Sequence, residues 1–425
     1  MAADVISRID AAPGDLLGEQ RQGSRAALWC LRALTLAAVV LVVRTGHAQI
    51  DRAAVAAPAY AVASGHLGAA YPSAVASARD SVAFQAPGFS LLAGAVVAAW
   101  EAVVGPPGAA GALTFAAYCT VALVVWAGGR LARRHSSGPT AEVMFLVAVA
   151  LSPWFRESLS NYFHPGDVMA LGFLLLGLYL ASESRWAWAG AAVGLGIASK
   201  QWAVLALPVL AVMAPDARQR GRLGGATLAG AALPFVPFFV VAPRAAWDVL
   251  RGPVPVPGGL VPQTTVVGML REYPFHVQVS HVDDLARALP LVCAVAVAGC
   301  WLLINRRTHG AFVPASLKEG VWLLVACFAL RLVADCIALS YYALPLFTLL
   351  AIAEAGRGRF PLYTVLSGFV LAAWYGTGFA RRVLDPWHAA IVFTVLVGLL
   401  AAGAFVLIRR TGAPPLRPEG FSAAR

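Results

Sequence analysis

The sequence predicts an all-α membrane protein, a polytopic bundle of about twelve transmembrane helices. Three observations lead to this fold class. Of the 425 residues, 60% are hydrophobic and only 12% are charged, and the mean hydropathy is +0.73. Apolar runs recur from residue 26 to residue 408. Arginine-rich turns separate many of these runs. This composition excludes a soluble domain.

The expected helices follow the apolar runs in chain order. Several runs are shorter than the roughly 20 residues of an ordinary membrane span. Short helices indicate tilted or re-entrant segments that surround a cavity at membrane depth. The runs cover residues 26–43, 109–128, 141–153, 167–181, 187–199, 201–213, 223–242, 285–304, 321–338, 340–354, 360–378 and 387–408.

The basic residues set the expected orientation. If residues 87–104 lie on the outer surface and do not cross, the arginine-rich turns all face one side, which the positive-inside rule assigns to the cytoplasm. We therefore expect a multi-pass protein of the plasma (inner) membrane with both termini cytoplasmic. The same rule accounts for the net charge of +11 without a nucleic-acid partner. The turns are residues 130–135, 216–222, 305–309, 356–359 and the tail from Arg409.

We expect a single membrane domain over residues 26–408 between cytoplasmic tails at 1–25 and 409–425 that lack defined structure. Two long outer loops are expected, at 44–108 and 243–284. No Ala-x-Ala cleavage site follows the first apolar run, so this run is interpreted as a retained anchor. Arg32, in the inner half of that run, is expected to snorkel to the cytoplasm.

The first outer loop opens with Asp51 and continues as an alanine-rich stretch with an apolar face. We expect an amphipathic helix at the membrane interface there. Asp51 has two open interpretations. It is either a helix N-cap or a general base placed where a water-soluble acceptor meets a membrane-borne donor.

Lys200 lies in the middle of an apolar stretch, residues 187–213. A lone ammonium at the bilayer centre costs at least several kcal/mol. A continuous helix over this stretch would also exceed the roughly 30 Å hydrocarbon core. The sequence therefore predicts two short helices that meet near Ser199 and Gln201, with Lys200 at the tip facing outward. Such a cation is suited to an anionic ligand.

Other polar side chains are expected at the same outer face. His164 is a candidate phosphate ligand, and Asp167 is either a helix cap or part of the site. Arg331 and Asp335 lie four residues apart on one expected helix, so they form either an intrahelical ion pair or a phosphate-binding group. Tyr341 and Tyr342 are interfacial belt residues or line a substrate groove.

No motif requires a cofactor. A His and an Asp three residues apart specify no metal, and dependence on a divalent metal stays open. The six cysteines lie in apolar segments without CxxC spacing, which predicts packing thiols.

Several segments together resemble one family. They are Asp51 with Tyr60, Gly65 and Tyr71-Pro72; Phe84-Gln-Ala-Pro87-Gly-Phe89; Phe163-His-Pro-Gly-Asp167; Ile197-Ala-Ser-Lys200-Gln-Trp202; and Ser340-Tyr-Tyr342-Ala-Leu-Pro345. In this order they resemble the GT-C superfamily of integral-membrane glycosyltransferases. More narrowly, they are similar to the glycosyltransferase 87, or DUF2029, branch, which includes polyprenyl-phosphate-mannose-dependent mannosyltransferases.

The resemblance implies transfer of mannose or another sugar from a polyprenyl phosphate donor to a hydroxyl of a glycolipid or glycan acceptor. It implies an outer-face site, inversion at the anomeric carbon and Asp51 as general base. Lys200, His164 and Arg331 would hold the donor phosphate. The expected substrate-binding residues are Asp167, Gln201, Arg271, Tyr341 and Tyr342. The alternative is a transporter or flippase of a lipid-linked saccharide, because broken helices also line transport sites.

Overall fold

The computed structural model describes residues 13–44, 52–70, 87–105, 109–136, 138–244, 246–247, 265, 267, 279–335, 339–376 and 384–410. Every regular element within these ranges is helical, as expected. The α-helices are α2 (Pro13–Arg44), α3 (Arg52–Ala63), α5 (Pro87–Val104), α6 (Ala109–Ser136), α7 (Pro139–Leu151), α8 (Pro153–Arg156), α9 (Pro165–Ser182), α10 (Trp186–Ser199), α11 (Ala206–Met213), α12 (Ala217–Ala232), α13 (Val236–Val241), α16 (Val279–His309), α17 (Leu317–Ala334), α18 (Leu344–Ala355), α19 (Leu362–Gly376) and α21 (Pro386–Arg410).

Short turns of other helix types connect some of them. The 3-10 turns are η1 (Leu67–Ala69), η4 (Gln201–Leu205), η5 (Leu233–Phe235) and η6 (Ser340–Ala343), and η3 (Glu157–Asn161) is a π-helical turn. Since α2 begins at Pro13, residues 13–25 of the expected amino-terminal tail are helical.

Among the described residues, five helical segments are long and apolar enough to cross a membrane, or six if the bent pair 139–151 and 153–161 counts as one span. Other apolar helices, such as α10 and α18, are shorter. The predicted number of about twelve spans is not confirmed. The five candidates are residues 87–104, 109–136, 165–182, 217–241 and 288–309, so they include the helix that we expected on the outer surface.

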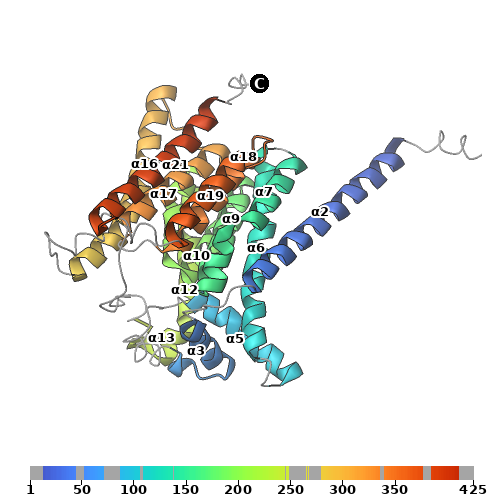
Figure 1. The fold of residues 1–425 in the computed structure, drawn as a ribbon, viewed down its shortest axis with the longest axis vertical. Coiled ribbons are helices and arrows are strands. Elements are labelled where there is room, and N and C mark those ends of the chain that lie inside the picture. Colours follow the sequence, from blue (N-terminus) through green and yellow to red (C-terminus); the bar gives the residue numbers. More distant parts are fainter. Residues whose placement is uncertain are drawn as a thin grey trace, which may run out of the picture.

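The arginine-rich turns gather at one end of the bundle. One pocket of about 340 Å³ is lined by Arg134 of the first turn, by Pro215 next to the second, and by Ala315 between the third turn and α17. The fourth turn joins them, because Gly356 lies directly against the His135 ring. In Figure 1 the carboxyl ends of α16 and α21 point to one end of the molecule, while α3 and α13 lie at the opposite end. The side of the membrane that each end faces stays a prediction.

The helix break at Lys200 is confirmed. Helix α10 ends at Ser199, Lys200 is extended, and η4 leads into α11. The start of α10 and the end of α11 line the same pocket through Trp186 and Met213, so the two helices form a hairpin with Lys200 at its tip.

Close packing of α12 against α10 supports the hairpin. A Cβ atom on Gly190, Gly194 or Gly230 would lie 2.3–2.6 Å from a backbone oxygen of the facing helix. Small residues at such positions let helix backbones approach closely in a membrane. The interface therefore holds α10, and with it the position of Lys200, against a rigid neighbour.

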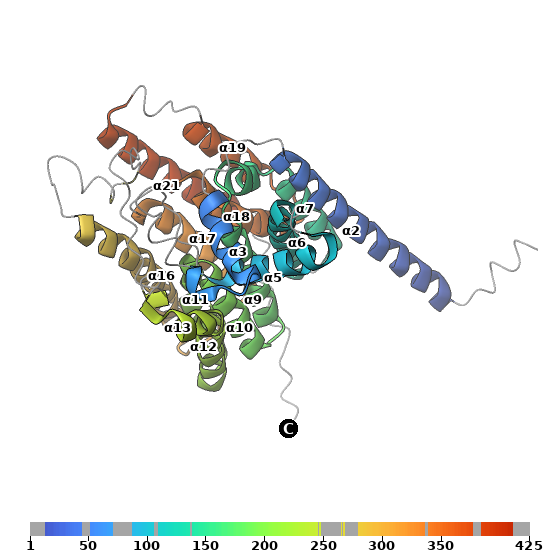
Figure 2. The ribbon, with the colours of Figure 1, turned by 90° about the horizontal axis from the view of Figure 1, so that it is seen from below.

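Arg32 does not snorkel as expected. Its side chain is buried and forms a salt bridge with the fully buried carboxylate of Glu142 on α7. Burial of an arginine requires such a partner, because an unpaired charge inside the bundle is very unfavourable. The pair joins α2 to the bundle, whereas the amino-terminal part of α2 stands away from it in Figures 1 and 2.

Candidate active site

The candidate site lies where several helix ends meet, away from the arginine-rich turns. Helices α9 and α18 begin there, and α10 and α17 end there. The other ends of α9, α10 and α17 are close to the opposite pocket, because Ser182, Trp186 and Leu317 line it. The chain therefore brings distant segments together at the end that carries Lys200.

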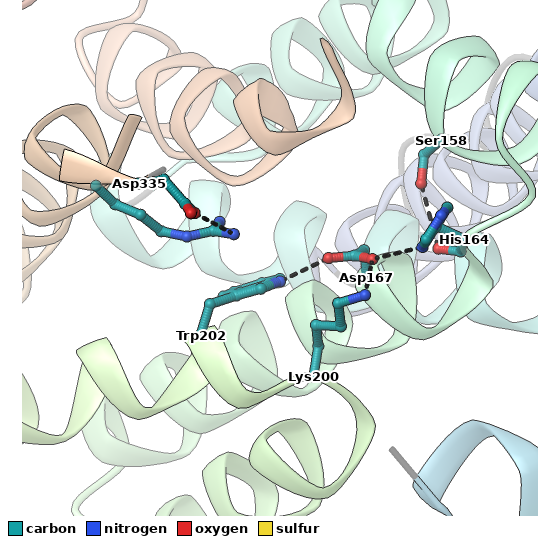
Figure 3. Close-up of polar contacts among 7 residues, drawn as sticks. Ser158, His164, Asp167, Lys200, Trp202 and Asp335 are labelled. Carbon is teal, nitrogen blue, oxygen red and sulfur yellow. Dashed lines mark hydrogen bonds and ion pairs between the residues drawn. The ribbon is translucent and has the colours of Figure 1, made fainter. Parts of the chain in front are cut away.

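Asp167, in the first turn of α9, is the centre of this site (Figure 3). Its Oδ1 accepts a hydrogen bond from Trp202 Nε1 at 2.7 Å. Its Oδ2 lies 3.2 Å from Lys200 Nζ and 3.5 Å from His164 Nδ1. The predicted residues Lys200, His164 and Asp167 thus form one cluster.

Exposure distinguishes the members of this cluster. The Asp167 and His164 side chains are each 5% exposed, whereas the Lys200 side chain is 20% exposed. Asp167 Oδ2 makes no hydrogen bond among the described residues, so its position depends on the adjacent Lys200 ammonium and His164 ring. The buried carboxylate orients Lys200 and His164, and the ammonium of Lys200 remains accessible to a ligand.

His164 is held by its backbone as well as its ring. Its N–H donates to the Ser158 carbonyl at 2.6 Å, and Ser158 Oγ donates to the His164 carbonyl at 3.3 Å. The preceding residue, Phe163, is buried and has a φ of 61°, in the left-handed region that a bulky side chain rarely adopts. Strained backbone of this kind clusters at functional sites.

An aromatic wall borders the imidazole. Tyr341 stacks on His164 with 4.4 Å between ring centroids and 19° between ring planes. Tyr162 lies 5.1 Å from Tyr341, and Tyr342 lies 4.9 Å from Tyr341 at 90°. Rings at such distances attract one another and restrict side-chain motion. The structure therefore brings the predicted Tyr341 and Tyr342 to His164.

Arg331 adds a second cation, at the end of α17. Its guanidinium lies 4.6 Å from the Tyr342 ring centroid and 5.5 Å from that of Trp202. Its Nη2 is 3.6 Å from Asp335 Oδ2, so the expected intrahelical pair is present at long distance. Arg331 Nη1 is buried without a hydrogen-bond partner among the described residues. Trp202 connects the two halves of the site, because it contacts both Asp167 and Arg331.

Gln201, next to Lys200, is exposed and lines an apolar groove of about 460 Å³. The remaining lining is hydrophobic and comes from α10, α12, η5 and α13, namely Ile197, Leu228, Ala231, Ala232, Phe235, Val236, Phe239 and Val240. An apolar surface therefore lies one residue away from the exposed cation.

Asp51 and Arg271 lie outside the described residues. The described residues on either side of Asp51 both contact the candidate site. Ser160 Oγ donates a hydrogen bond to the carbonyl of Val43, near the end of α2. Arg52, the first residue of α3, lies with its guanidinium 5.0 Å from the Phe163 ring centroid. The same guanidinium donates to Ala110 O and Thr114 Oγ1, each at 3.0 Å.

The sequence analysis gave no role to Trp202, which contacts Asp167 and Arg331. It also gave none to Glu157, which contacts Ser340, the residue before Tyr341. Trp202 belongs to a segment that carried the family resemblance, so its type and position were a usable signal. Glu157 had no comparable signal, because its partner Ser340 is 183 residues away in the chain. No group of three metal-ligating side chains is found in the described part of the chain.

Comparisons with known proteins bear on this site. Residues 57–216 match the family model described as the N-terminal domain of α-(1→6)-mannopyranosyltransferase. This segment is less than half of the chain, and it includes His164, Asp167 and Lys200. A search of curated proteins found no match.

Among solved structures, the chain is similar to two structures of the Archaeoglobus fulgidus oligosaccharyltransferase. One is AglB in complex with an inhibitory peptide and a dolichol-phosphate, with 12% identity and a TM-score of 0.45, covering 92% of this chain and 57% of that one. The other is the apo form, also with 12% identity and a TM-score of 0.45, covering 90% and 56%. The chain thus spans little more than half the length of these proteins. The match over residues 57–216 agrees with the expected similarity to mannosyltransferases, and it supports glycosyl transfer as the general activity.

Proposed function

We propose that this protein transfers a sugar, mannose or another hexose, from a polyprenyl phosphate donor to a hydroxyl of a glycolipid or glycan acceptor at the outer membrane face. The observation that carries the proposal is the position of Lys200. Its partly exposed ammonium lies 3.2 Å from a buried carboxylate, and its neighbour Gln201 lines an apolar groove. A cation beside an apolar groove suits a ligand with a phosphate head and a hydrocarbon tail.

In the proposed reaction, an acceptor hydroxyl attacks the anomeric carbon from the face opposite the phosphate. The new carbon–oxygen bond forms as the bond to the phosphate oxygen breaks, so the anomeric configuration inverts. The hydroxyl proton passes to a base, which we assign to Asp51. Val43 and Arg52, on either side of Asp51 in the chain, contact residues 160–163, and this supports the assignment.

Polyprenyl phosphate leaves with the bonding electrons. Lys200 and His164 stabilise the developing negative charge, and Arg331 contributes from the other side of Trp202. Asp167 acts on these cations and not on the sugar, because Trp202, His164 and Lys200 surround its oxygens. The aromatic wall of Tyr341 and Tyr342 then borders the sugar, and Gln201 and Arg271 are proposed as further substrate contacts.

The test uses the full chain in lipid nanodiscs with a panel of polyprenyl-phosphate sugars and a mannoside acceptor. We expect acceptor-dependent transfer by the wild type, with inversion seen by NMR of the product. Asp51→Asn should lower kcat by roughly 10³-fold, as loss of an essential base does. Asp80→Asn is the matched control, because it removes a carboxylate from the same loop.

Full activity of Asp51→Asn would remove Asp51 as the base. Absence of transfer with every donor, together with acceptor-independent movement of the labelled lipid across vesicles, would replace the enzyme with a flippase. An arm with a chelator measures dependence on a divalent metal.

A further inference from the structure

The π-helical turn η3, between α8 and the His164 segment, contains a carboxylate, Glu157, that accepts one local and one long-range hydrogen bond. Glu157 Oε1 accepts a hydrogen bond from Asn161 Nδ2 at 2.7 Å, within the turn itself. Glu157 Oε2 accepts a hydrogen bond from Ser340 Oγ, also at 2.7 Å. π-Helical turns are rare and occur frequently at functional sites. One side chain therefore joins the turn before α9 to the turn before α18.

The two joined turns also position the two stacked rings: η3 hydrogen-bonds the backbone of His164, and η6 contains Tyr341. In η3, Ser158 bonds both the N–H and the carbonyl of His164. In η6, Tyr341 directly follows Ser340 and stacks on His164. The Glu157–Ser340 hydrogen bond thus ties the backbone that carries Tyr341 to the backbone that fixes His164.

The chemistry of Glu157 fits a positioning role better than a role as a base. Each of its two carboxylate oxygens already accepts a strong hydrogen bond. Two hydrogen bonds to one carboxylate fix its orientation, as a positioning role requires. The half-buried site of Glu157 and the buried Ser340 strengthen both bonds, because competing water is reduced.

We propose that Glu157 is a positioning residue that sets the orientation of the His164 imidazole through Ser340 and Tyr341. The proposal rests on the proposed function, in which His164 stabilises the leaving phosphate. A ring held parallel to Tyr341 presents its nitrogen-bearing edge in one direction, toward Asp167 and the site. Loss of the bond would let η6 move and would widen the range of imidazole orientations.

The experiment measures transfer kinetics for Glu157→Ala, Glu157→Gln, Ser340→Ala and Ser340→Thr. We expect Glu157→Ala and Ser340→Ala to lower kcat by roughly 10-fold with KM changed less than about twofold. Glu157→Gln and Ser340→Thr keep an acceptor or a hydroxyl and should retain activity within about threefold. The double variant Glu157→Ala/Ser340→Ala should be no less active than Glu157→Ala alone, because Glu157→Ala already removes the one bond that Ser340→Ala breaks.

Ser182→Ala is the matched control, since Ser182, at the opposite end of the bundle, donates its Oγ hydrogen bond to the Tyr179 carbonyl of its own helix. Equal and severe losses for Glu157→Gln and Glu157→Ala would make Glu157 a catalytic base and overturn the positioning role. Additive losses in the double variant, or full activity of Ser340→Ala, would also overturn the positioning role.

A measurement that does not depend on sugar transfer tests this inference separately from the proposed function. Hydrogen exchange of residues 161–164 should become faster in Ser340→Ala than in the wild type, because η3 loses its tie to η6. If the wild type transferred no sugar, the proposed function would fail, and exchange would still report on the Glu157–Ser340 tie. Unchanged exchange would overturn the tie itself.

Discussion

Several ion pairs are buried in the described part of this bundle, and two of them differ clearly in what surrounds them. Arg32 and Glu142 join α2 to α7, and their side chains are 7% and 0% exposed. Lys200 and Asp167 join the tip of the α10–α11 hairpin to the start of α9, with exposures of 20% and 5%. The first carboxylate has one cationic partner in the described structure, whereas the second lies against a lysine, a histidine and an indole.

The difference separates a structural pair from a site. An ionisable residue in a membrane protein is a functional candidate by default. The buried Arg32–Glu142 pair shows that an ionisable residue alone does not make a functional site. A ligand must also be able to reach the charge, and several chemical groups must lie close to it. The Lys200–Asp167 pair meets both conditions, because the ammonium is partly exposed, His164 and Trp202 contact the same carboxylate, and Arg331 lies 5.5 Å from the Trp202 ring centroid.

The largest stability effect is expected at the structural pair. Glu142→Ala leaves the Arg32 guanidinium buried without its counter-charge, which should cost about 3–5 kcal/mol. We expect little folded protein after detergent extraction, measured by thermal unfolding with size-exclusion detection. The double variant Arg32→Met/Glu142→Met removes both charges and should recover most of the folded protein. A Glu142→Ala protein as stable as the wild type would show that the pair does not hold α2.

At the Lys200–Asp167 pair we expect a large effect on activity and a small effect on stability. Lys200→Ala should lower transfer by roughly 10²-fold, because a phosphate ligand loses its cation. Its cost in stability should stay near 1–2 kcal/mol, because Asp167 keeps the Trp202 hydrogen bond and the His164 contact. The measurements are kcat/KM and the melting temperature. Lys318→Ala is the matched control, because Lys318 is the only other lysine and is exposed at the start of α17.

A smaller effect is expected at Trp202, which links Asp167 to Arg331. Trp202→Phe keeps an aromatic ring against Phe328, 5.3 Å away in the wild type, but loses the N–H that donates to Asp167. We expect kcat to fall roughly 5- to 10-fold, as for loss of one hydrogen bond to a charged group. Trp202→Leu also removes the ring beneath Arg331 and should be worse. Equal kinetics for Trp202→Phe and the wild type would mean that Asp167 is oriented by its cations alone.

The sequence predicted the parts of this fold that follow from local chemistry. The cost of a lone ammonium predicted the helix break at Lys200, and hydropathy predicted an all-helical membrane protein. Arg32 was wrongly expected to snorkel, because its partner Glu142 lies 110 residues further along the chain. No periodicity or propensity encodes such a pairing, which depends on how α2 and α7 pack.

In the candidate site, too, the sequence predicted which residues belong to the site but not which atoms meet after folding. Lys200, His164 and Asp167 were selected by residue type and resemblance, and the structure brings them together. The roles of Trp202 and Glu157 depend on atoms that meet only after folding, as does the stack of Tyr341 on His164. The base assigned to Asp51 stays a prediction, because that residue lies outside the described ranges.

The smallest effect is expected at a third pair, Asp385 and His388, at the start of α21. Both side chains are well exposed, and the hydrogen bond from His388 holds the pKa of the Asp385 carboxyl below its usual value. A lowered pKa in the folded state stabilises the protein above the unfolded-state pKa, and this contribution is lost as the pH falls through the folded-state pKa. His388→Ala should therefore lower the melting temperature by about 1 °C or less near neutral pH, with no difference from the wild type in strong acid. Transfer activity should be unchanged. In this protein we expect the exposure of an ion pair, and not the mere presence of opposite charges, to decide how much the pair contributes to stability. A large loss of stability or activity in His388→Ala would contradict this view.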